Sequence, residues 1–508
     1  MKLSIPLIFQ SGMVLQRHKP INVWGESVDG DTITLKLDDE TIKTQCTDGK
    51  WSAQFSSREA CLSTKLIISS EKTSEQIEIS DVAVGEVFLA GGQSNMEFII
   101  KYDKDFETTK ALPDDEYLRY FAYPQVPFDG FLEKEGLGKF GIWRKWDSEE
   151  NRREFSAIAA YMALDLREKL DVPIGILACN WGGTPACAWT DKDIIYGDYD
   201  TFKVIVDWEN QVLKDMPYEQ YMENSEKKLP PVSKEMQDFQ DYWMMGGDMT
   251  EFFKQGPPPL TYDTYTTYLP GPRSAVFTGN LYENMLKKVA PYTMAAFLWY
   301  QGEDDDARDR QDCYEKSMAV MIENWRQLFN DNLPFYQIEL APFRGIGVTG
   351  AKKYDLLREK QYISSLLVDD VYEVCILDVG EEFNIHPRNK KTVGHRLANM
   401  VLKHNYGYDD KIADCPRIKE VRVLETKIEC EFDNCNELSI KNSLDDVLKL
   451  EGFSMQEYET EGNKLIIKGE KTADLVTVEY CYDNYCVASL FNEEENPAFG
   501  FRKDNHED

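Results

Sequence analysis

The sequence predicts an α/β protein in which a doubly wound, mainly parallel sheet is flanked by N-terminal and C-terminal β-sandwich-like modules. From Val84 to about His404, apolar segments that fit buried strands alternate with amphipathic segments that fit helices. This order builds a parallel sheet with helices on both faces. Outside that region, short segments alternate apolar and polar residues, as antiparallel modules do. We therefore expect three domains, at residues 1–83, 84–404 and 405–508.

The two outer modules are predicted from alternation with a period of two residues. Successive side chains of a strand point to opposite faces, so such a segment buries one face only. The turn dipeptides Asp29-Gly30 and Asp48-Gly49 separate the first segments. The expected strands are 21–24, 32–37, 66–68 and 76–79 in the first module, and 421–423, 464–467 and 476–480 in the last.

The central domain is predicted from strands and helices in alternation. The helix after Ser156 carries one apolar stripe, formed by Ile158, Met162, Leu166 and Leu170, and it stops before Pro173. Two further helices are expected, one with apolar residues from Met318 to Phe329 and one that begins after Pro387, which fits a first helical turn. The expected strands of the sheet are 87–90, 174–178, 295–300, 335–338 and 374–377.

An insertion at 191–272 interrupts this alternation. It is acidic and aromatic, and it ends in the proline-rich stretches 257–259 and 270–272. We expect it to be helical and to lie over the strand ends. Two roles stay open for it: a lid or substrate platform, or an appendage that only adds packing.

The composition restricts the classes of partner. The chain has 508 residues, of which 42% are hydrophobic and 29% charged, as in globular proteins. Its formal net charge of −33 argues against binding to nucleic acid or to an anionic membrane surface. It has no run of 18 apolar residues and no export signal, so we expect a cytoplasmic protein. The oligomeric state, a homo-oligomer included, stays open.

The eleven cysteines, scattered from Cys46 to Cys486, lack CxxC spacing. In a chain without an export signal, reduced and mostly buried thiols are expected, and neither a metal nor another cofactor is predicted.

The segment 91–97, Gly-Gly-Gln-Ser-Asn-Met-Glu, follows the predicted strand 87–90 directly. It places Ser94 at the carboxyl end of a buried strand, where open α/β sheets bind their ligands. The glycines permit a sharp turn and a close approach of substrate. Met96 stands where the Gly-x-Ser-x-Gly elbow has its second glycine, so this is a different kind of nucleophile motif.

Two more segments follow predicted strands and supply groups that stabilise negative charge. Gly182 and Gly183, in Trp-Gly-Gly-Thr-Pro, can expose backbone N–H groups, as an oxyanion hole requires. Gln301, in Trp-Tyr-Gln-Gly-Glu, can donate from its amide, and Glu303 can brace its neighbours. A fourth segment places His386 before the last helix, where it can pair with Ser94, because triads are defined by geometry and not by order in the chain.

Together, these segments resemble the sialate O-acetylesterase family of SGNH-type hydrolases. The matching motifs are Gly-Gln-Ser-Asn-Met at 92–96, Trp-Gly-Gly-Thr-Pro at 181–185, Trp-Tyr-Gln-Gly-Glu at 299–303 and Ile-His-Pro at 385–387. The similarity covers most of residues 8–403. It implies an SGNH-hydrolase-like fold and a metal-independent esterase that removes acetyl groups from sugar hydroxyls.

The resemblance also implies roles for single residues. Ser94 would be the nucleophile and His386 the base. The oxyanion hole would consist of the Ser94 amide, a Gly182 or Gly183 amide and the Gln301 side chain. Gln93, Asn95 and Glu303 would support the site.

One position departs from the family pattern. SGNH hydrolases often have an aspartate three residues before the histidine, and here that residue is Phe383. Either a backbone carbonyl orients His386, which makes a Ser–His dyad, or another acid reaches it. The acids considered are Asp378, Glu381, Glu382 and Glu303, and the dyad is preferred.

Three hypotheses about function follow, of which the leading one is an esterase that acts on O-acetylated sialate. A sialate carboxylate would need an arginine against the acidic field, and only Arg273 and Arg344 are candidates. An acetylesterase acting on neutral xylo- or manno-oligosaccharides is the first alternative. A carbohydrate-binding protein with an inactive esterase site is the second, and the intact Ser94, Gln301 and His386 argue against it.

Overall fold

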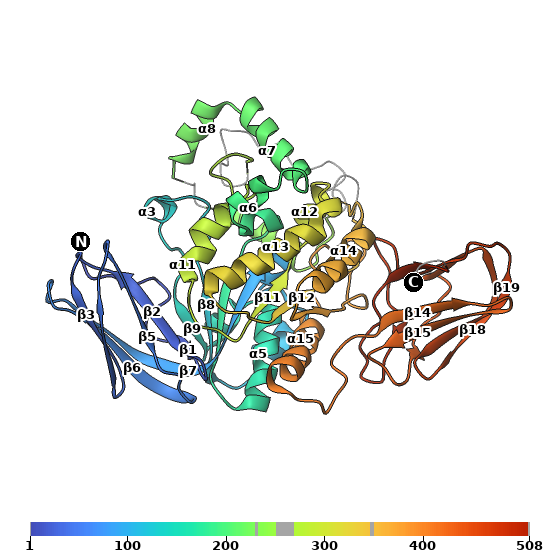
Figure 1. The fold of residues 1–508 in the computed structure, drawn as a ribbon, viewed down its shortest axis with the longest axis horizontal. Coiled ribbons are helices and arrows are strands. Elements are labelled where there is room, and N and C mark those ends of the chain that lie inside the picture. Colours follow the sequence, from blue (N-terminus) through green and yellow to red (C-terminus); the bar gives the residue numbers. More distant parts are fainter. Residues whose placement is uncertain (1, 229–231, 250–268, 346–349, 506–508) are drawn as a thin grey trace. The chain divides into compact units, whose positions relative to one another are not determined.

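The computed structural model describes residues 2–228, 232–249, 269–345 and 350–505 (Figure 1). The chain forms two compact units. The first unit comprises Met1–Ser233, Pro259–Trp299 and Val320–Phe335, and the second comprises Lys234–Pro258, Tyr300–Ala319 and Tyr336–Asp508. The proline-rich stretch at 257–259 lies outside the described residues.

Strand β7, Gln76–Gly92, organises the first unit. Its first half pairs antiparallel with β6, Cys61–Ser70, and its second half pairs parallel with β10, Ile174–Asn180. Buried and exposed residues are mixed along β7 as far as residue 81, and every residue from Val82 onward is buried. A strand of a half-exposed sheet alternates, whereas a strand covered on both faces is apolar throughout. Residue 83 therefore lies within a strand, close to where β7 changes partners.

The α/β part of the first unit has the strand order β11-β7-β10-β8-β9. Strand β10 runs parallel to β7 and to β8, and β9 is antiparallel to β8. The bounds are β8 Asp115–Ala122, β9 Trp143–Trp146 and β11 Ala296–Tyr300. Helix α5, Ala157–Leu170, packs on β8 and β10, and the Ser156 hydroxyl caps its N-terminus by accepting from the Ala159 amide. The predicted helix and the mixed α/β class with parallel strands are confirmed.

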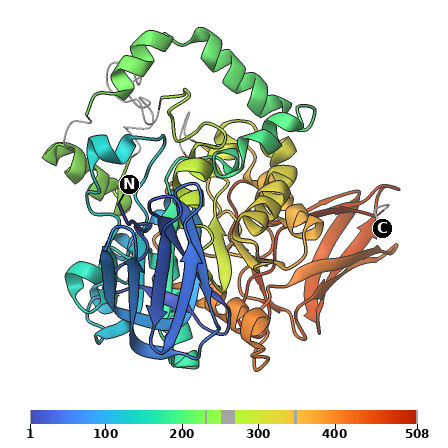
Figure 2. The same ribbon diagram turned by 60° about the vertical axis from the view of Figure 1, so that its left-hand side comes forward.

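The N-terminal strands confirm the predicted ones (Figure 2). Strand β3 pairs with β4 and β6, and β2 pairs with β5, all antiparallel, whereas β1 runs parallel to β7. The bounds are β1 Val14–Gln16, β2 Ile21–Glu26, β3 Thr32–Leu37, β4 Glu40–Gln45 and β5 Lys50–Phe55.

The described part of the insertion is helical, as predicted. Its helices are α6 Lys192–Gly197, α7 Lys203–Asp215 and α8 Tyr218–Ser225 in the first unit, and α9 Lys234–Met244 in the second; η2 Ala186–Trp189 precedes the insertion. Short helical segments elsewhere are α1 Ser94–Glu97, η1 Ile100–Tyr102, α2 Phe106–Thr109, α3 Phe131–Glu135, α4 Glu149–Arg152, η3 Tyr282–Leu286 and α11 Lys287–Val289.

Helices α14 and α15 pack on strand β13 in the second unit. The bounds are β12 Phe335–Ile338, β13 Val371–Val374, α12 Glu303–Ala307, α14 Tyr354–Leu367 and α15 Lys390–Tyr406, and α13 spans Gln311–Phe329. The strand predicted at 335–338 is confirmed to the residue.

Two predicted boundaries around the last helix are wrong. The strand expected at 374–377 ends at Val374, because the chain turns there and the Val379 amide donates to the Ile376 carbonyl over 3.1 Å. The helix expected from Pro387 begins at Lys390. The Arg388 amide donates instead to the Glu381 carboxylate over 2.7 Å, which keeps this segment in a loop.

The C-terminal strands form antiparallel sheets with the orders β14-β15-β19-β18, β17-β20-β22 and β16-β21. They share one apolar core, which includes Ile428, Phe432, Leu465 and Tyr480. The bounds are β14 Arg417–Val423, β15 Lys427–Asp433, β16 Ser439–Ile440, β17 Leu448–Glu451, β18 Phe453–Glu461, β19 Lys464–Lys471, β20 Thr477–Tyr480, β21 Leu490–Phe491 and β22 Phe501–Asp504. The predicted C-terminal strands are confirmed, although the last one begins at Thr477 and not at residue 476.

Candidate active site

Ser94 lies at the carboxyl end of β7, as the sequence predicts. The strand ends at Gly92, Gln93 occupies the N-cap position of α1, and Ser94 is the first residue of that helix. Ser94 is half-buried, whereas Gln93 and Asn95 on either side of it are buried. A side chain at Gly91 would lie 2.9 Å from Trp325 and 3.0 Å from Trp299, so only glycine fits beneath this tryptophan pair.

The glycine pair after β10 lies beside Ser94. A Cβ atom at Gly182 would be 3.2 Å from the Ser94 Cβ, so glycine allows the two loops to approach closely. The Gly182 amide donates to the Glu97 carboxylate over 2.7 Å, and the Gln125 side chain donates to the same carboxylate over 3.1 Å. Glu97 thus ties the loop after β10 to helix α1. This function of Glu97 was not predicted.

The two glycines therefore differ in what their amides can do. The Gly182 amide is already bonded to Glu97. Gly183 is exposed, and its φ of +69° lies in the left-handed region that favours glycine. Of the pair, Gly183 is the better donor for an oxyanion.

Gln301 is held in one orientation in the second unit. It is fully buried, and its Nε2 donates to the Asp305 carboxylate over 2.6 Å. The Tyr314 hydroxyl donates to the Gln301 side-chain oxygen over 3.1 Å and to its carbonyl over 3.0 Å. With its oxygen already accepting, the amide presents its nitrogen as the group that can donate. Asp305 and Tyr314 are positioning residues that the sequence did not indicate.

His386 lies in the loop between β13 and α15, and 5% of its surface is exposed. Its backbone amide donates to the Asn384 side chain over 3.1 Å. Its Nδ1 atom has no hydrogen-bond partner among the described residues. Burial, and then the Lys390 ammonium, lowers the pKa of His386 to about 3. The imidazole is therefore neutral at physiological pH, which is the form that a general base requires.

The acids near His386 in sequence have other partners. Asp378 forms two hydrogen bonds with Arg396, of 2.6 and 2.7 Å. Glu381 accepts from Asn384.

Glu382 in turn pairs with Arg344 at 3.0 Å. Phe383 stands where SGNH hydrolases often have the orienting aspartate. It is 56% exposed, so its side chain does not lie in the core. Glu303 is buried. The pKa of the Tyr300 hydroxyl is raised, first by the burial of Tyr300 and then by the negative charge of the Glu303 carboxylate. Three of the four acids considered, Asp378, Glu381 and Glu382, are thus engaged by other groups.

We expect the single substitutions Asp378→Asn, Glu381→Gln and Glu382→Gln each to lower kcat by less than about tenfold, because none of these acids orients the imidazole. Asp378→Asn also leaves the buried Arg396 without its anion, so its activity must be read well below its unfolding temperature. A drop of a thousandfold or more in one folded variant would make that residue the third member of a triad.

The depressed pKa of His386 predicts the pH dependence of the reaction. A folded-state pKa of about 3 means that the imidazole loses its proton far below its usual value of 6.5. The plateau of kcat/KM should therefore extend to about pH 5, whereas an ordinary histidine base would lose activity below about pH 6.5. An acidic limb near pH 6.5 for wild type would mean that an anion or water offsets the burial.

Arg273, proposed for substrate binding, is engaged elsewhere. Its guanidinium pairs with Glu226 and donates to the Ser225 hydroxyl over 2.7 Å. It also lies 4.8 Å from the centre of the Phe128 ring. Arg344 is likewise paired, with Glu382.

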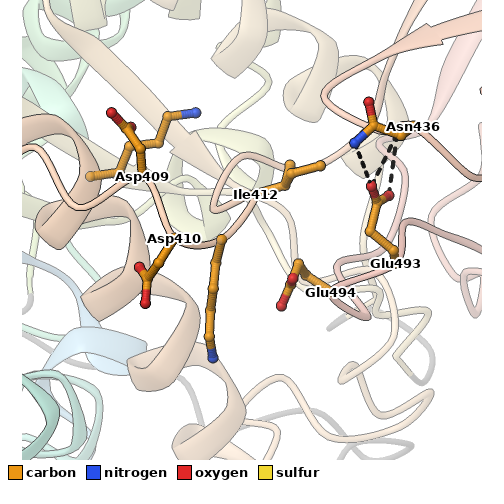
Figure 3. A pocket seen from close by; sticks show the side chains of 8 residues that line it. Asp409, Asp410, Ile412, Asn436, Glu493 and Glu494 are labelled. Atoms are coloured by element: carbon orange, nitrogen blue, oxygen red, sulfur yellow. Dashed lines mark hydrogen bonds between the residues drawn. The ribbon is translucent and has the colours of Figure 1, made fainter.

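A surface pocket of about 370 Å³ belongs to a different part of the second unit (Figure 3). It is lined by Lys403, Asp409, Asp410, Lys411, Ile412, Asn436, Glu493 and Glu494, and Figure 3 shows the Glu493 carboxylate turned toward Asn436. None of the predicted catalytic residues lines it.

Other sequence expectations concern cysteines, metals and membranes. All eleven cysteines are free, and nine of them are buried. Within the described ranges, no cluster of three or more His, Cys, Asp or Glu residues is arranged to hold a metal ion. No helix in the described part of the chain has the length and apolar character needed to cross a membrane.

Comparisons with known proteins agree with these motifs. Residues 264–403, which include Gln301 and His386, match the family model "Carbohydrate esterase, sialic acid-specific acetylesterase". The chain is 22% identical to the sialate O-acetylesterase of Rattus norvegicus over 453 residues, which are 81% of this chain and 75% of that protein. It is 23% identical to the human sialate O-acetylesterase over 447 residues, 82% and 73% of the two chains.

The fold also matches a solved structure. A carbohydrate acetylesterase from Xanthomonas citri superposes with a TM-score of 0.73 and 23% identity, over 99% of each chain. The family-model match and the curated relatives together identify the chain as a carboxylic ester hydrolase. Within this class, the chain is similar to the sialate O-acetylesterases over about four fifths of its length.

Proposed function

We propose that this protein is a serine esterase that removes O-acetyl groups from sugars, with O-acetylated sialate as the leading substrate. The observation that carries the proposal is the half-buried Ser94 at the end of a buried strand, with the Gly182–Gly183 pair held against it. The similarity to sialate O-acetylesterases over four fifths of the chain supports the choice of substrate.

In the proposed reaction, the Ser94 hydroxyl attacks the acetyl carbonyl carbon while His386 accepts its proton. The negative charge on the carbonyl oxygen is stabilised by the Ser94 amide, the Gly183 amide and the Gln301 side chain. The carbon–oxygen bond to the sugar breaks, and the sugar oxygen leaves with the proton from His386. Water then attacks the acetyl-Ser94 ester through the same base, which releases acetate and restores the serine.

We propose that Ser94 and His386 act as a dyad. The engaged carboxylates of Asp378, Glu381 and Glu382 support this view. A neutral imidazole can accept the serine proton without a carboxylate, although the resulting imidazolium is then less stabilised. Gln93 and Asn95 are proposed as buried supports of the segment around Ser94, and Glu303 as a buried support of the segment around Gln301.

Further proposals concern the fold and the location of the protein. We propose an SGNH-type, doubly wound central domain at 84–404, with β-sandwich-like modules at 1–83 and 405–508. A cytoplasmic location remains a proposal.

A second candidate substrate is a neutral acetylated glycan. The pairing of Arg273 with Glu226 and of Arg344 with Glu382 favours it, because a sialate carboxylate would have to compete for these cations. The net charge of −33 acts in the same direction.

A panel of 9-O-acetyl sialic acid, acetylated xylo-oligosaccharides and acetylated manno-oligosaccharides tests the proposal. Released acetate is measured to obtain kcat/KM for each substrate. The proposal expects the sialate to give the highest value, and the neutral alternative expects one of the other two to exceed it. Glycan binding without any acetate release would make the protein a binding module with an inactive site.

A further inference from the structure

Helix α9 of the insertion brings an aromatic side chain to His386 within the second unit. The centre of the Trp243 ring lies 5.2 Å from the centre of the His386 imidazole, with the two planes inclined by 56°. His386 is the proposed base, so any ester that reacts there must pass close to this indole.

The loop that follows α9 contacts the His386 loop as well. Gly246 has a φ of +80°, and a Cβ atom there would lie 3.2 Å from the Cδ of Arg388, two residues after His386. The Gly247 and Asp248 amides donate to the Tyr242 carbonyl and hydroxyl, over 2.9 and 3.0 Å. The end of α9 is therefore built as a tight turn that holds Trp243 at this position.

The apolar residues of α9 lie on the same side of the helix as Trp243. The structure describes every residue of this helix, and none of them is buried. Met236, Phe239 and Trp243 recur at positions i, i+3 and i+7, so they share one side of the helix. Met236 is 51% exposed. Phe239 and Trp243 are half-buried. An aromatic side chain beside a proposed catalytic residue is typical of a ligand site.

We propose that Trp243 binds the sugar ring of the acetyl ester and holds it beside His386. The C–H groups on one face of a pyranose are apolar and carry partial positive charge, which suits the negative face of an indole. The site would thereby prefer esters of sugars to esters of small alcohols. This inference rests on the proposed function, because it assigns the part of the same site that recognises the sugar.

The test compares an acetyl ester of a sugar with one of a small alcohol: the sugar ester that the substrate panel shows to be cleaved best, and ethyl acetate. Wild type, Trp243→Ala, Trp243→Leu and Trp243→Phe are assayed by acetate release. The matched control is Trp208→Ala, because Trp208 is another half-buried tryptophan of the insertion and lies 5.7 Å from Phe277.

We expect Trp243→Ala and Trp243→Leu to lower the ratio of kcat/KM for the sugar ester to that for ethyl acetate by at least about tenfold, mainly through KM for the sugar. Trp243→Phe should retain most of the ratio because a ring remains, and Trp208→Ala should keep the wild-type value. The leucine variant preserves bulk without a ring, so it also tests stacking if the alanine variant folds poorly.

Three results would overturn the inference. An unchanged ratio in the alanine and leucine variants would mean that Trp243 does not contact the sugar. An equal loss on both substrates would mean that it acts only on His386. A wild-type protein that releases acetate neither from ethyl acetate nor from any sugar ester of the substrate panel would refute the proposed function and this inference with it, whereas in the first two cases the esterase assignment stands.

Discussion

Replacement of Ser94 by alanine is expected to lower kcat for acetyl ester hydrolysis by at least ~10³-fold, because the covalent route through acetyl-serine is lost. The half-buried Ser94 lies in a short turn after β7, and alanine fits this turn without new contacts. The folded state should therefore keep its thermal unfolding midpoint.

The matched control for this substitution is Ser365→Ala. Ser365 is a half-buried serine of helix α14 whose hydroxyl donates to the Tyr362 carbonyl of its own helix over 2.7 Å. This variant should retain wild-type kcat. A folded Ser94→Ala protein with a tenth of wild-type turnover would show that Ser94 is not the nucleophile.

Replacement of Gln301 by alanine is expected to lower kcat by about 10²–10³-fold with little change in KM, because an oxyanion donor bonds most strongly in the transition state. Asp305 and Tyr314 fix the Gln301 amide before substrate arrives, so no reorganisation is needed during the reaction. A variant that loses only affinity would assign Gln301 to substrate binding.

Gln301 is fully buried, so stability must be measured beside activity. Alanine removes one hydrogen bond from Asp305 and one from Tyr314, although the Tyr314 hydroxyl can still donate to the backbone carbonyl of residue 301, so a loss of stability of about 1 kcal/mol for each lost bond is expected. Steady-state assays should therefore be run well below the unfolding midpoint of the variant. Asp305→Asn is a useful companion, because the asparagine keeps the size of the side chain but weakens the hold on the amide. We expect it to have a smaller effect on kcat than Gln301→Ala.

The strands and helices were predictable where hydrophobic periodicity decides the structure. The strand at 335–338 and the helix after Ser156 bury continuous apolar segments or stripes, and both agree with the structure. The boundaries near His386 were not predictable in this way. There, tertiary hydrogen bonds such as that from the Arg388 amide to Glu381 determine the backbone conformation. They outweigh the local preference of proline for a first helical turn.

The candidate site was predictable in part from motifs. Ser94, Gly183 and His386 lie in short segments with glycine turns or rare residue types, which can be recognised in a sequence. Asp305 could have been found, because it stands four residues after Gln301, but it lies in an acidic run that resembles a solvated surface.

The contact between Trp243 and His386 joins residues far apart in the chain. Such a contact leaves no local signature. In the sequence, Trp243 was therefore only one of several aromatic residues in the insertion.

Covalent labelling of the wild-type enzyme with a fluorophosphonate tests the assignment of the nucleophile most directly. This probe forms a stable ester with an activated serine hydroxyl, and mass spectrometry locates the label. We predict one label per chain, on the peptide that contains Ser94, together with loss of esterase activity at the same rate. Label on another residue, or full inactivation with Ser94 unmodified, would contradict the catalytic role proposed for Ser94.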